Sequence, residues 1–327
     1  MITKSLKYLF FEILLLLIVS FVQAQTPDFS QSHTNLIYSN PAFAGIYNCP
    51  HVYTSYRTKY ASIAGGYSTN FISFDMYMSA IKSDIGAYVI HDIQNSIFYS
   101  TLFQGIYAKE FQLRKKLFLK TALAGGVVQT KIQTQHLVFS DMLNPFSDDF
   151  EQTKEEFFDK NKWYFPIEPA FLVYSDNFFC GITIKNLQAK KREKNIENSP
   201  LQRVYSLYGG TEFSTTKAFT KRYLVTMYPY VNVTLSEMFS YTQFGMIAQK
   251  GRVQFGGGYR QNLPFDAESF EVFVGFFEKK FKFAYNCDIS INSYIKNNCN
   301  SHEVSLSYEF NCIAKRKKYE AVKAPLF

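Results

Sequence analysis

From Pro50 to the end of the chain, apolar and polar residues alternate in short segments separated by turn residues. Odd positions from 281 to 291 are aromatic or apolar, and the even positions between them are small, polar or charged. The same two-residue period recurs at 252–260 and 302–310. A period of two is the side-chain period of a β-strand, and no segment of 12 or more residues follows a helical period. The pattern therefore predicts an all-β protein.

Fourteen segments of the chain have the alternation expected of strands. They lie near residues 50–60, 67–78, 84–92, 97–111, 116–129, 165–174, 177–187, 202–214, 222–235, 238–248, 251–260, 268–278, 281–292 and 301–311. The number is even, and most segments have the roughly 9–11 residues that cross a bilayer at a tilt. This favours an antiparallel transmembrane β-barrel of the outer-membrane type, with about 14 strands.

The lengths of the connections support the barrel over a soluble sandwich, which would show the same alternation. Connections after even-numbered strands are short and mostly basic, whereas the two longest, 130–164 and 188–201, follow odd-numbered strands. Short turns at one rim and long loops at the other are typical of outer-membrane barrels. Many aromatic residues near strand ends fit interfacial girdles, although ordinary β-propensity explains them equally well.

Composition narrows the class further. The 327 residues include 34 Phe and 24 Tyr, with 47% hydrophobic and 19% charged residues. These values exclude a disordered chain and a coiled coil. The only apolar run that approaches the length of a membrane helix lies at the N-terminus, which excludes a helical membrane protein.

The first 24 residues have the layout of a signal peptide. Lys4 and Lys7 precede the apolar stretch 8–22, and Val22-Gln23-Ala24 places small residues at the expected cleavage positions. We predict cleavage after Ala24. A single membrane anchor is the alternative, but the stretch is short and no stop-transfer charges follow it.

Five cysteines are present, and their pairing is left open by the sequence. They are Cys49, Cys180, Cys287, Cys299 and Cys312. No pair has C-x-x-C spacing, so a zinc site is not expected, and we expect no metal or organic cofactor.

Few residues in the sequence are candidates for catalysis or for binding a metal or an anion. His91-Asp92 suggests a hydrolase, but no G-x-S-x-G is present and we place the pair in a solvated external loop. An acidic group comprising Glu151, Glu155, Glu156 and Asp159 lacks calcium-binding spacing and is interpreted as a solvated loop. The basic stretch 190–194 fits lipopolysaccharide phosphates or a solvated loop, rather than nucleic acid. We therefore predict no catalytic residues.

Two motifs near the ends of the chain carry a family resemblance. The segment 25–48 precedes the first strand and contains Asp28, Phe29, Ser30 and Gln31, followed by Asn40, Pro41, Ala42, Phe43 and Gly45. The chain ends with an H-E-V-S-L-S-Y-E-F strand at 302–310 and a basic tail that contains Lys315, Arg316, Lys317 and Lys318. These features resemble the PorP/SprF family of outer-membrane proteins of type IX secretion and gliding systems.

The resemblance implies a division of the chain and a function. We expect a signal peptide at 1–24, a periplasmic or plug segment at 25–48, the barrel at 49–312 and a basic periplasmic tail at 313–327. The family assists secretion or surface retention of a large adhesin-like protein with a C-terminal sorting domain, and it contacts periplasmic components linked to peptidoglycan. We accordingly expect location in the outer membrane, contact with its lipid, and no enzymatic activity. A channel for small or hydrophobic compounds is the alternative.

A barrel of this width needs a plug, inward-folded loops or an open channel. The aromatic residues Phe29, Tyr38, Phe43 and Tyr47 suit anchorage of the 25–48 segment inside the barrel or against its periplasmic mouth. A leader without fixed contacts is the alternative.

Overall fold

The computed structural model describes residues 29–47, 49–60, 65–133, 161–189, 202–215, 225–237, 239–263, 266–291 and 299–311. The predicted signal peptide, Asp28, the acidic group at 151–159, the basic stretch 190–194 and the basic tail lie outside these residues. Among the described residues, no helix is long and apolar enough to span a membrane.

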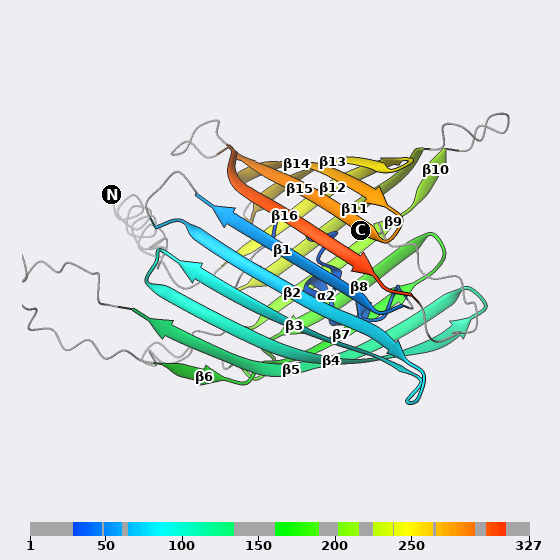
Figure 1. Ribbon diagram of the computed structural model, residues 1–327, viewed down its shortest axis with the longest axis horizontal. Coiled ribbons are helices and arrows are strands. Elements are labelled where there is room, and N and C mark those ends of the chain that lie inside the picture. Colours follow the sequence, from blue (N-terminus) through cyan, green and yellow to red (C-terminus); the bar gives the residue numbers. More distant parts are fainter. Residues whose placement is uncertain are drawn as a thin grey trace, which may run out of the picture.

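Fourteen long strands form the wall of a closed antiparallel barrel (Figure 1). They are β1 (His51–Lys59), β2 (Tyr67–Met78), β3 (Ser83–Gln94), β4 (Phe98–Arg114), β5 (Leu117–Ile132), β7 (Ile167–Tyr174), β8 (Phe178–Lys185), β9 (Val204–Thr211), β11 (Val225–Ser236), β12 (Ser240–Lys250), β13 (Val253–Asn262), β14 (Asp266–Glu278), β15 (Phe281–Ser290) and β16 (Cys299–Glu309). The predicted fold class is confirmed.

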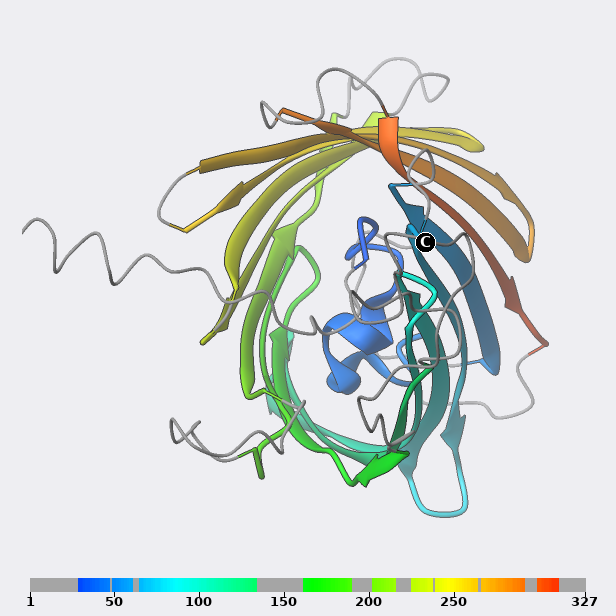
Figure 2. The ribbon, with the colours of Figure 1, turned by 90° about the vertical axis from the view of Figure 1, so that its left-hand side faces the viewer.

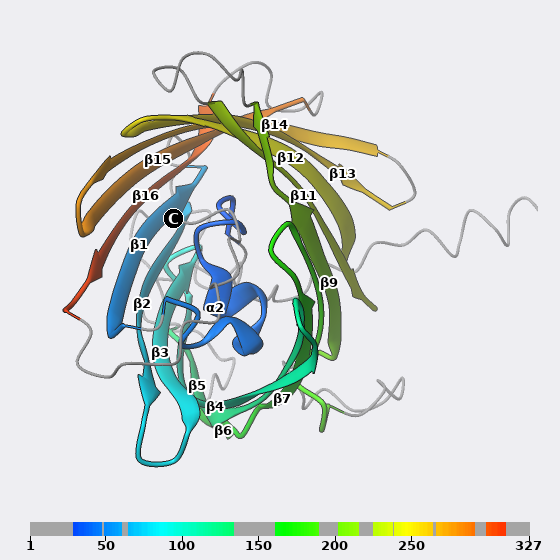
Figure 3. The ribbon, with the colours of Figure 1, turned by 90° about the vertical axis from the view of Figure 1, so that its right-hand side faces the viewer.

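The barrel closes where β1 pairs with β16. The pairing is continuous over the length of β1, from His51 opposite Glu309 to Lys59 opposite Ser301. Closure leaves no free edge along this wall, which a membrane requires because hydrocarbon cannot satisfy exposed backbone groups. Views along the barrel show the strands as a ring around the N-terminal segment (Figures 2 and 3).

Two short strands continue the wall beyond its long members. β6 (Lys162–Tyr164) pairs with β5 ahead of β7, and β10 (Phe213–Thr215) pairs with β11 after β9. The β11 ladder with β9 stops at Tyr230 and resumes with β10 at Met227. Pro229 lies in this gap. Because proline has no N–H to donate to a ladder, it accounts for the interruption. The structure therefore shows an interruption of the ladder on one side of β11.

The two faces of the wall follow the alternation in the sequence. On β14, Phe270, Val272 and Val274 point outward and are exposed, whereas Glu271 and Phe273 point into the barrel and are buried. Apolar outward and mixed inward faces are typical of strands that contact lipid on one side and a filled lumen on the other.

We call the two ends of the barrel the loop end, where β1 finishes, and the turn end, where β1 begins. The connections 133–166 and 186–203 lie at the loop end, as predicted, and the turns at 115–116, 251–252 and 279–280 lie at the turn end. The connections are not strictly sorted by length between the two ends. At the turn end, the connection from β10 to β11 covers 216–224, and at the loop end the β3–β4 turn covers only 95–97.

Residues 29–47, which we call the lumen segment, fill the interior. They contain a single helical turn, α2 (Leu36–Ser39), and a 3-10 turn, η1 (Pro41–Phe43). Phe29 packs edge-on against Tyr38 and Phe71, and Phe43 packs edge-on against Phe179 and Tyr208. The hydrophobic core of this protein therefore lies inside the barrel, between the lumen segment and the wall.

Candidate functional site

The motif at the start of the lumen segment binds the motif in the last strand. The backbone N–H groups of Ser30 and Gln31 donate to Glu303 Oε2 at 2.8 and 3.2 Å. The Gln31 side chain donates to the Glu303 carbonyl at 3.0 Å, and its Oε1 accepts from Ser305 at 2.9 Å. Hydrogen bonds to a carboxylate are about twice as strong as neutral ones. Two motifs at opposite ends of the sequence therefore form one contact.

A second carboxylate supports the same region. The Ser30 hydroxyl donates to Asp288, and Arg57 Nη2 lies 3.1 Å from Asp288 Oδ2. Arg57 is also hydrogen-bonded through Nε to Ser301 Oγ at 3.0 Å. These residues lie near the loop-end tips of β15, β1 and β16. Their burial is tolerated because the charges are paired and hydrogen-bonded.

A third cluster joins the segment to β12, β13 and β14. Arg260 Nη2 donates to the Phe29 carbonyl at 3.2 Å and lies 3.3 Å from Glu271 Oε1. Gln243 donates to Glu271 Oε2 at 2.6 Å and to the Ser30 carbonyl at 2.9 Å, and it accepts from Ser32 Oγ at 2.9 Å. Strands β12 to β16 thus hold the first residues of the segment.

The structure explains why the N-P-A-F-x-G motif has the residues it has at each of its two ends. The Asn40 side chain accepts from the Ala42 N–H at 2.8 Å and caps η1, and Pro41 occupies the first position, where no N–H is needed. The Asn40 amide also donates to the Phe171 carbonyl at 3.1 Å. Ala42 is fully buried, so a larger side chain at this position has no space.

Gly45 ends the motif in a conformation that other residues avoid. Its φ is +72°, and an added Cβ would lie 2.3 Å from Asp84 Oδ1. Its N–H donates to Asp75 Oδ2 at 2.6 Å, and Asp75 Oδ1 lies 3.2 Å from His51 Nδ1. The glycine lets the backbone approach the wall closely at the turn end.

A buried ion pair completes the turn-end anchor. Lys120 Nζ lies 2.7 Å from Asp84 Oδ2, and both side chains are 1% exposed. The lysine also donates to the Ala44 carbonyl. Breaking such a pair leaves an uncompensated buried charge, which is strongly destabilising. The lumen segment is consequently fixed to the wall at both of its ends.

Eight of the nine motif residues named above thus lie in one segment that contacts the wall, while Asp28 and the tail residues Lys315, Arg316, Lys317 and Lys318 lie outside the described residues. Four charged wall residues of these clusters were not expected from the sequence: Arg57, Asp75, Asp84 and Lys120. A signal was available, because each is a charged residue at an inward position of an alternating strand.

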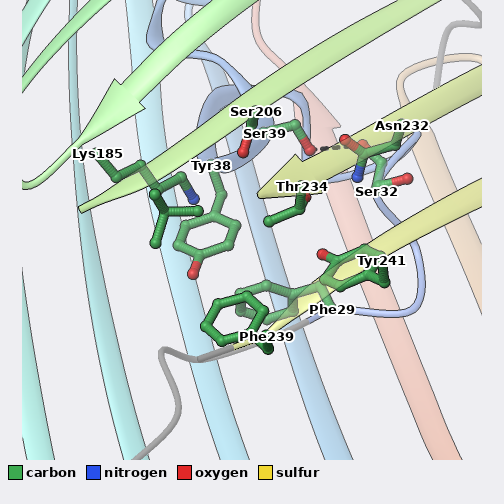
Figure 4. Close-up of a pocket in the computed structure, with 11 residues that line it drawn as sticks. Phe29, Ser32, Tyr38, Ser39, Lys185, Ser206, Asn232, Thr234, Phe239 and Tyr241 are labelled. Atoms are coloured by element: carbon green, nitrogen blue, oxygen red, sulfur yellow. Dashed lines mark hydrogen bonds between the residues drawn. The ribbon is translucent and has the colours of Figure 1, made fainter. Parts of the chain in front are cut away.

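A small hollow of about 40 Å³ lies beside the start of the lumen segment (Figure 4). Its lining from the lumen segment is Phe29, Ser32, Tyr38 and Ser39, and its lining from the wall is Lys185, Val204, Ser206, Asn232, Thr234, Phe239 and Tyr241. Lys185 Nζ lies 3.3 Å from the centre of the Tyr38 ring. The hollow lies toward the loop end, because Lys185 ends β8 and Val204 begins β9.

The model of one protein family, the type IX secretion system membrane protein PorP/SprF, matches residues 21–308. The chain belongs to the PorP/SprF family. The match covers the lumen segment together with nearly all of the barrel. It therefore includes both motifs of the lumen segment, the one that begins at Asp28 and the one that begins at Asn40. Membership and the barrel fold place the protein in the outer membrane.

Solved outer-membrane barrels resemble this PorP/SprF chain only distantly. The Pseudomonas putida toluene transporter TodX is 11% identical with a TM-score of 0.46, over 86% of this chain and 94% of that one. The KdgM porin is 7% identical with a TM-score of 0.35, over 80% and 99%. Acinetobacter baumannii Omp33 is 7% identical with a TM-score of 0.39, over 80% and 98%. At these scores the likeness says nothing about function, and no curated protein matches the chain.

The His91-Asp92 pair of this PorP/SprF protein is not in a loop, contrary to the sequence-based expectation. Both residues lie in β3, where neighbouring side chains point to opposite faces of the wall. Asp92 is buried inside and accepts from Thr69 at 2.5 Å, whereas His91 Nδ1 lies 2.9 Å from Thr101 Oγ1. Asp92 therefore does not orient the His91 ring, as a catalytic pair would require.

The pairing of some cysteines is now defined. Cys287 and Cys299 form a disulfide near the loop end, Cys49 is also disulfide-bonded, and Cys180 is free and exposed. Cys287, Cys299 and His302 are also the one group of three possible metal ligands among the described residues. The disulfide engages both sulfurs, so they are not thiolate ligands in this state.

Proposed function

We propose that this protein is a non-catalytic outer-membrane barrel that assists the secretion, or the retention at the cell surface, of a large adhesin-like protein through the type IX system. The client is a secreted protein with a C-terminal sorting domain. By the usual rule for outer-membrane barrels, the loop end faces the cell exterior and the turn end faces the periplasm. The basic tail then meets peptidoglycan-linked secretion components inside the cell.

The observation that carries the proposal is the anchored lumen segment. Glu303 and Asp288 hold its start, while Asp75 and Lys120 hold its end. A segment fixed by buried charge-assisted hydrogen bonds at both ends makes the barrel a filled, rigid body rather than an open pore. Such a body suits a role in holding a partner.

A channel for small or hydrophobic compounds is the alternative function. It would require a continuous path past the lumen segment, whose Gln31, Ala42 and Phe43 side chains are fully buried. Many described wall residues that face the lumen are polar or charged, such as Arg57, Glu303 and Asn286, which does not suit a greasy substrate.

Deletion of the gene distinguishes the two functions. We expect loss of one large protein from the cell surface, detected by surface biotinylation and mass spectrometry, while permeability to small dyes and antibiotics stays unchanged. Failed uptake of a small hydrophobic nutrient with an intact surface proteome would favour the channel instead. Complementation with His91→Ala should restore the surface protein, because we assign His91 no catalytic role.

A further inference from the structure

The hairpin of β4 and β5 extends beyond its neighbour on one side. The β3–β4 ladder stops at Ala108, whereas the β4–β5 ladder continues to Arg114. On the other side, β7 covers β5 nearly to its first residue, where Phe118 pairs with Tyr174. The paired ends of β4 and β5 project at the right of Figure 1, which is the turn end. Residues 109–114, which we call the β4 edge, thus have a strand on one side only among the described residues.

The backbone of the β4 edge offers hydrogen-bonding groups on its open side. Where β4 begins, the N–H of Gln133 donates to the Ile97 carbonyl at 2.8 Å, so the odd-numbered residues of β4 bond to β5. The β4–β5 register has no shift before Gln112, and this alternation therefore continues to that residue. Glu110 and Gln112 consequently direct their N–H and C=O groups to the side without a strand. An unpaired edge of this kind is a template for another strand.

The side chains of the edge indicate which strand it fits. Phe111 and Leu113 point outward and are 46% and 53% exposed. Four exposed cations flank them: Lys82, Lys109, Arg114 and Lys115. None of these cations forms an ion pair among the described residues. The acid of the edge, Glu110, accepts a hydrogen bond from the Tyr174 hydroxyl. The edge therefore presents apolar surface and uncompensated positive charge.

We propose that the β4 edge receives an extended acidic segment of a periplasmic protein as an added strand. Backbone hydrogen bonds to Glu110 and Gln112 hold the segment, and its acidic side chains meet the cations. Its apolar side chains cover Phe111 and Leu113. This inference rests on the proposed function, which places the turn end in the periplasm.

Two other occupants match the edge less well. A second copy of this chain would bring like charges together, because Lys109 and Arg114 lie at the two ends of the edge, and like charges on paired strands are destabilising. Anionic phospholipid complements the cations, but it has no N–H and C=O groups at the spacing of a strand.

The first test removes one backbone donor from the edge. Gln112→Pro deletes the N–H on the open side and keeps the ladder with β5, because proline is tolerated where the N–H of an edge strand faces solvent. Gln112→Ala is the matched control, since both variants lose the same side chain and only the proline variant loses the N–H. We expect Gln112→Pro alone to lower the amount of the client protein at the cell surface. Heat-modifiable migration shows that both barrels are folded.

Photo-crosslinking in living cells identifies the occupant. A photo-reactive amino acid replaces Phe111, and the control position is Phe281, an exposed outward residue of β15 at the turn end. We expect position 111, but not 281, to link to a periplasmic protein through a segment rich in Asp and Glu, mapped by mass spectrometry. Gln112→Pro should lower the yield about tenfold, because the acceptor on the partner is left unpaired, and Gln112→Ala should not. Links only to phospholipid, only to a second barrel, or none from a folded barrel would overturn the proposal.

Charge reversal keeps the proposal testable if the proline variant does not fold. Lys109→Glu combined with Arg114→Glu should reduce the link from position 111, whereas Lys279→Glu, an exposed cation of the β14–β15 turn, should not. Equal yields in these variants would refute the acidic partner. If deletion of the gene removes the surface protein but position 111 links to no acidic segment, the proposed function stands and only this inference fails. If deletion leaves the surface proteome intact while the link forms, the edge stands and the proposed function fails.

Discussion

Gln31 and Glu303 bind each other in both directions, although 272 residues separate them in sequence. The Gln31 N–H donates to the Glu303 carboxylate, and the Gln31 amide donates to the Glu303 carbonyl. The pair joins the first described residues of the lumen segment to the strand that closes the barrel. It therefore couples the seating of the segment to closure of the wall.

This pair should behave as a coupled unit. We expect Glu303→Ala to destabilise the barrel by about 1.5–3 kcal/mol, because two backbone N–H groups lose a charged acceptor. Thermal unfolding in detergent, followed by heat-modifiable migration, measures the change. In a double-mutant cycle with Gln31→Ala, the coupling should be about 0.5–3 kcal/mol.

Ser307→Ala is the matched control for that cycle. Ser307 lies on the same inward face of β16, is buried, and its hydroxyl has no hydrogen-bond partner among the described residues. Additive effects of Gln31→Ala and Glu303→Ala, or a Ser307→Ala change of the same size, would show that the pair does not act together.

Gly45→Ala should loosen the turn-end anchor. The substitution combines a φ of +72° with a Cβ only 2.3 Å from Asp84 Oδ1, so both the backbone and the Asp84–Lys120 pair are disturbed. A cost of about 1–3 kcal/mol is expected from the backbone conformation alone. Gly125→Ala is the control, since an added Cβ there meets nothing within 4 Å. Equal unfolding temperatures for the two variants would contradict this account.

Lys120→Met should be among the most damaging single changes in the wall. It leaves Asp84 without its cation in a site 1% exposed, and a broken buried pair costs about 3–5 kcal/mol. Lys109→Met, at an exposed position of β4, should have little effect. The test of mechanism is partial rescue: adding Asp84→Asn to Lys120→Met should raise the unfolding temperature again. Further destabilisation by that second change would argue that the charge is not the cause.

The wall could be predicted from sequence because one physical rule governs it. Residues such as Phe270 and Val272 contact lipid while Glu271 contacts the lumen, so a two-residue period marks both the strand and its face. The segment at 29–47 has no period, because it packs on all sides against the interior. Its motifs could be recognised, but not their partners: Asp75, Asp84 and Lys120 become neighbours of Gly45 only when the barrel closes. His91 was misplaced because a solvated turn and a strand end look alike in a polar stretch.

The proposed function depends on the orientation of the barrel in the outer membrane. The connection 186–203 lies at the loop end and carries the basic stretch 190–194, which offers several trypsin sites. The turn after Arg114 contains Lys115 and Lys116 and lies at the opposite end. Trypsin added to intact cells should therefore cut within 190–194 and leave the 114–116 turn intact, as read by mass spectrometry of the fragments. Lysed cells provide the control, because there the Arg114–Lys116 turn is open to the protease as well. Cleavage at that turn in intact cells, with 190–194 protected, would invert the barrel and place the start of the lumen segment at the periplasmic side.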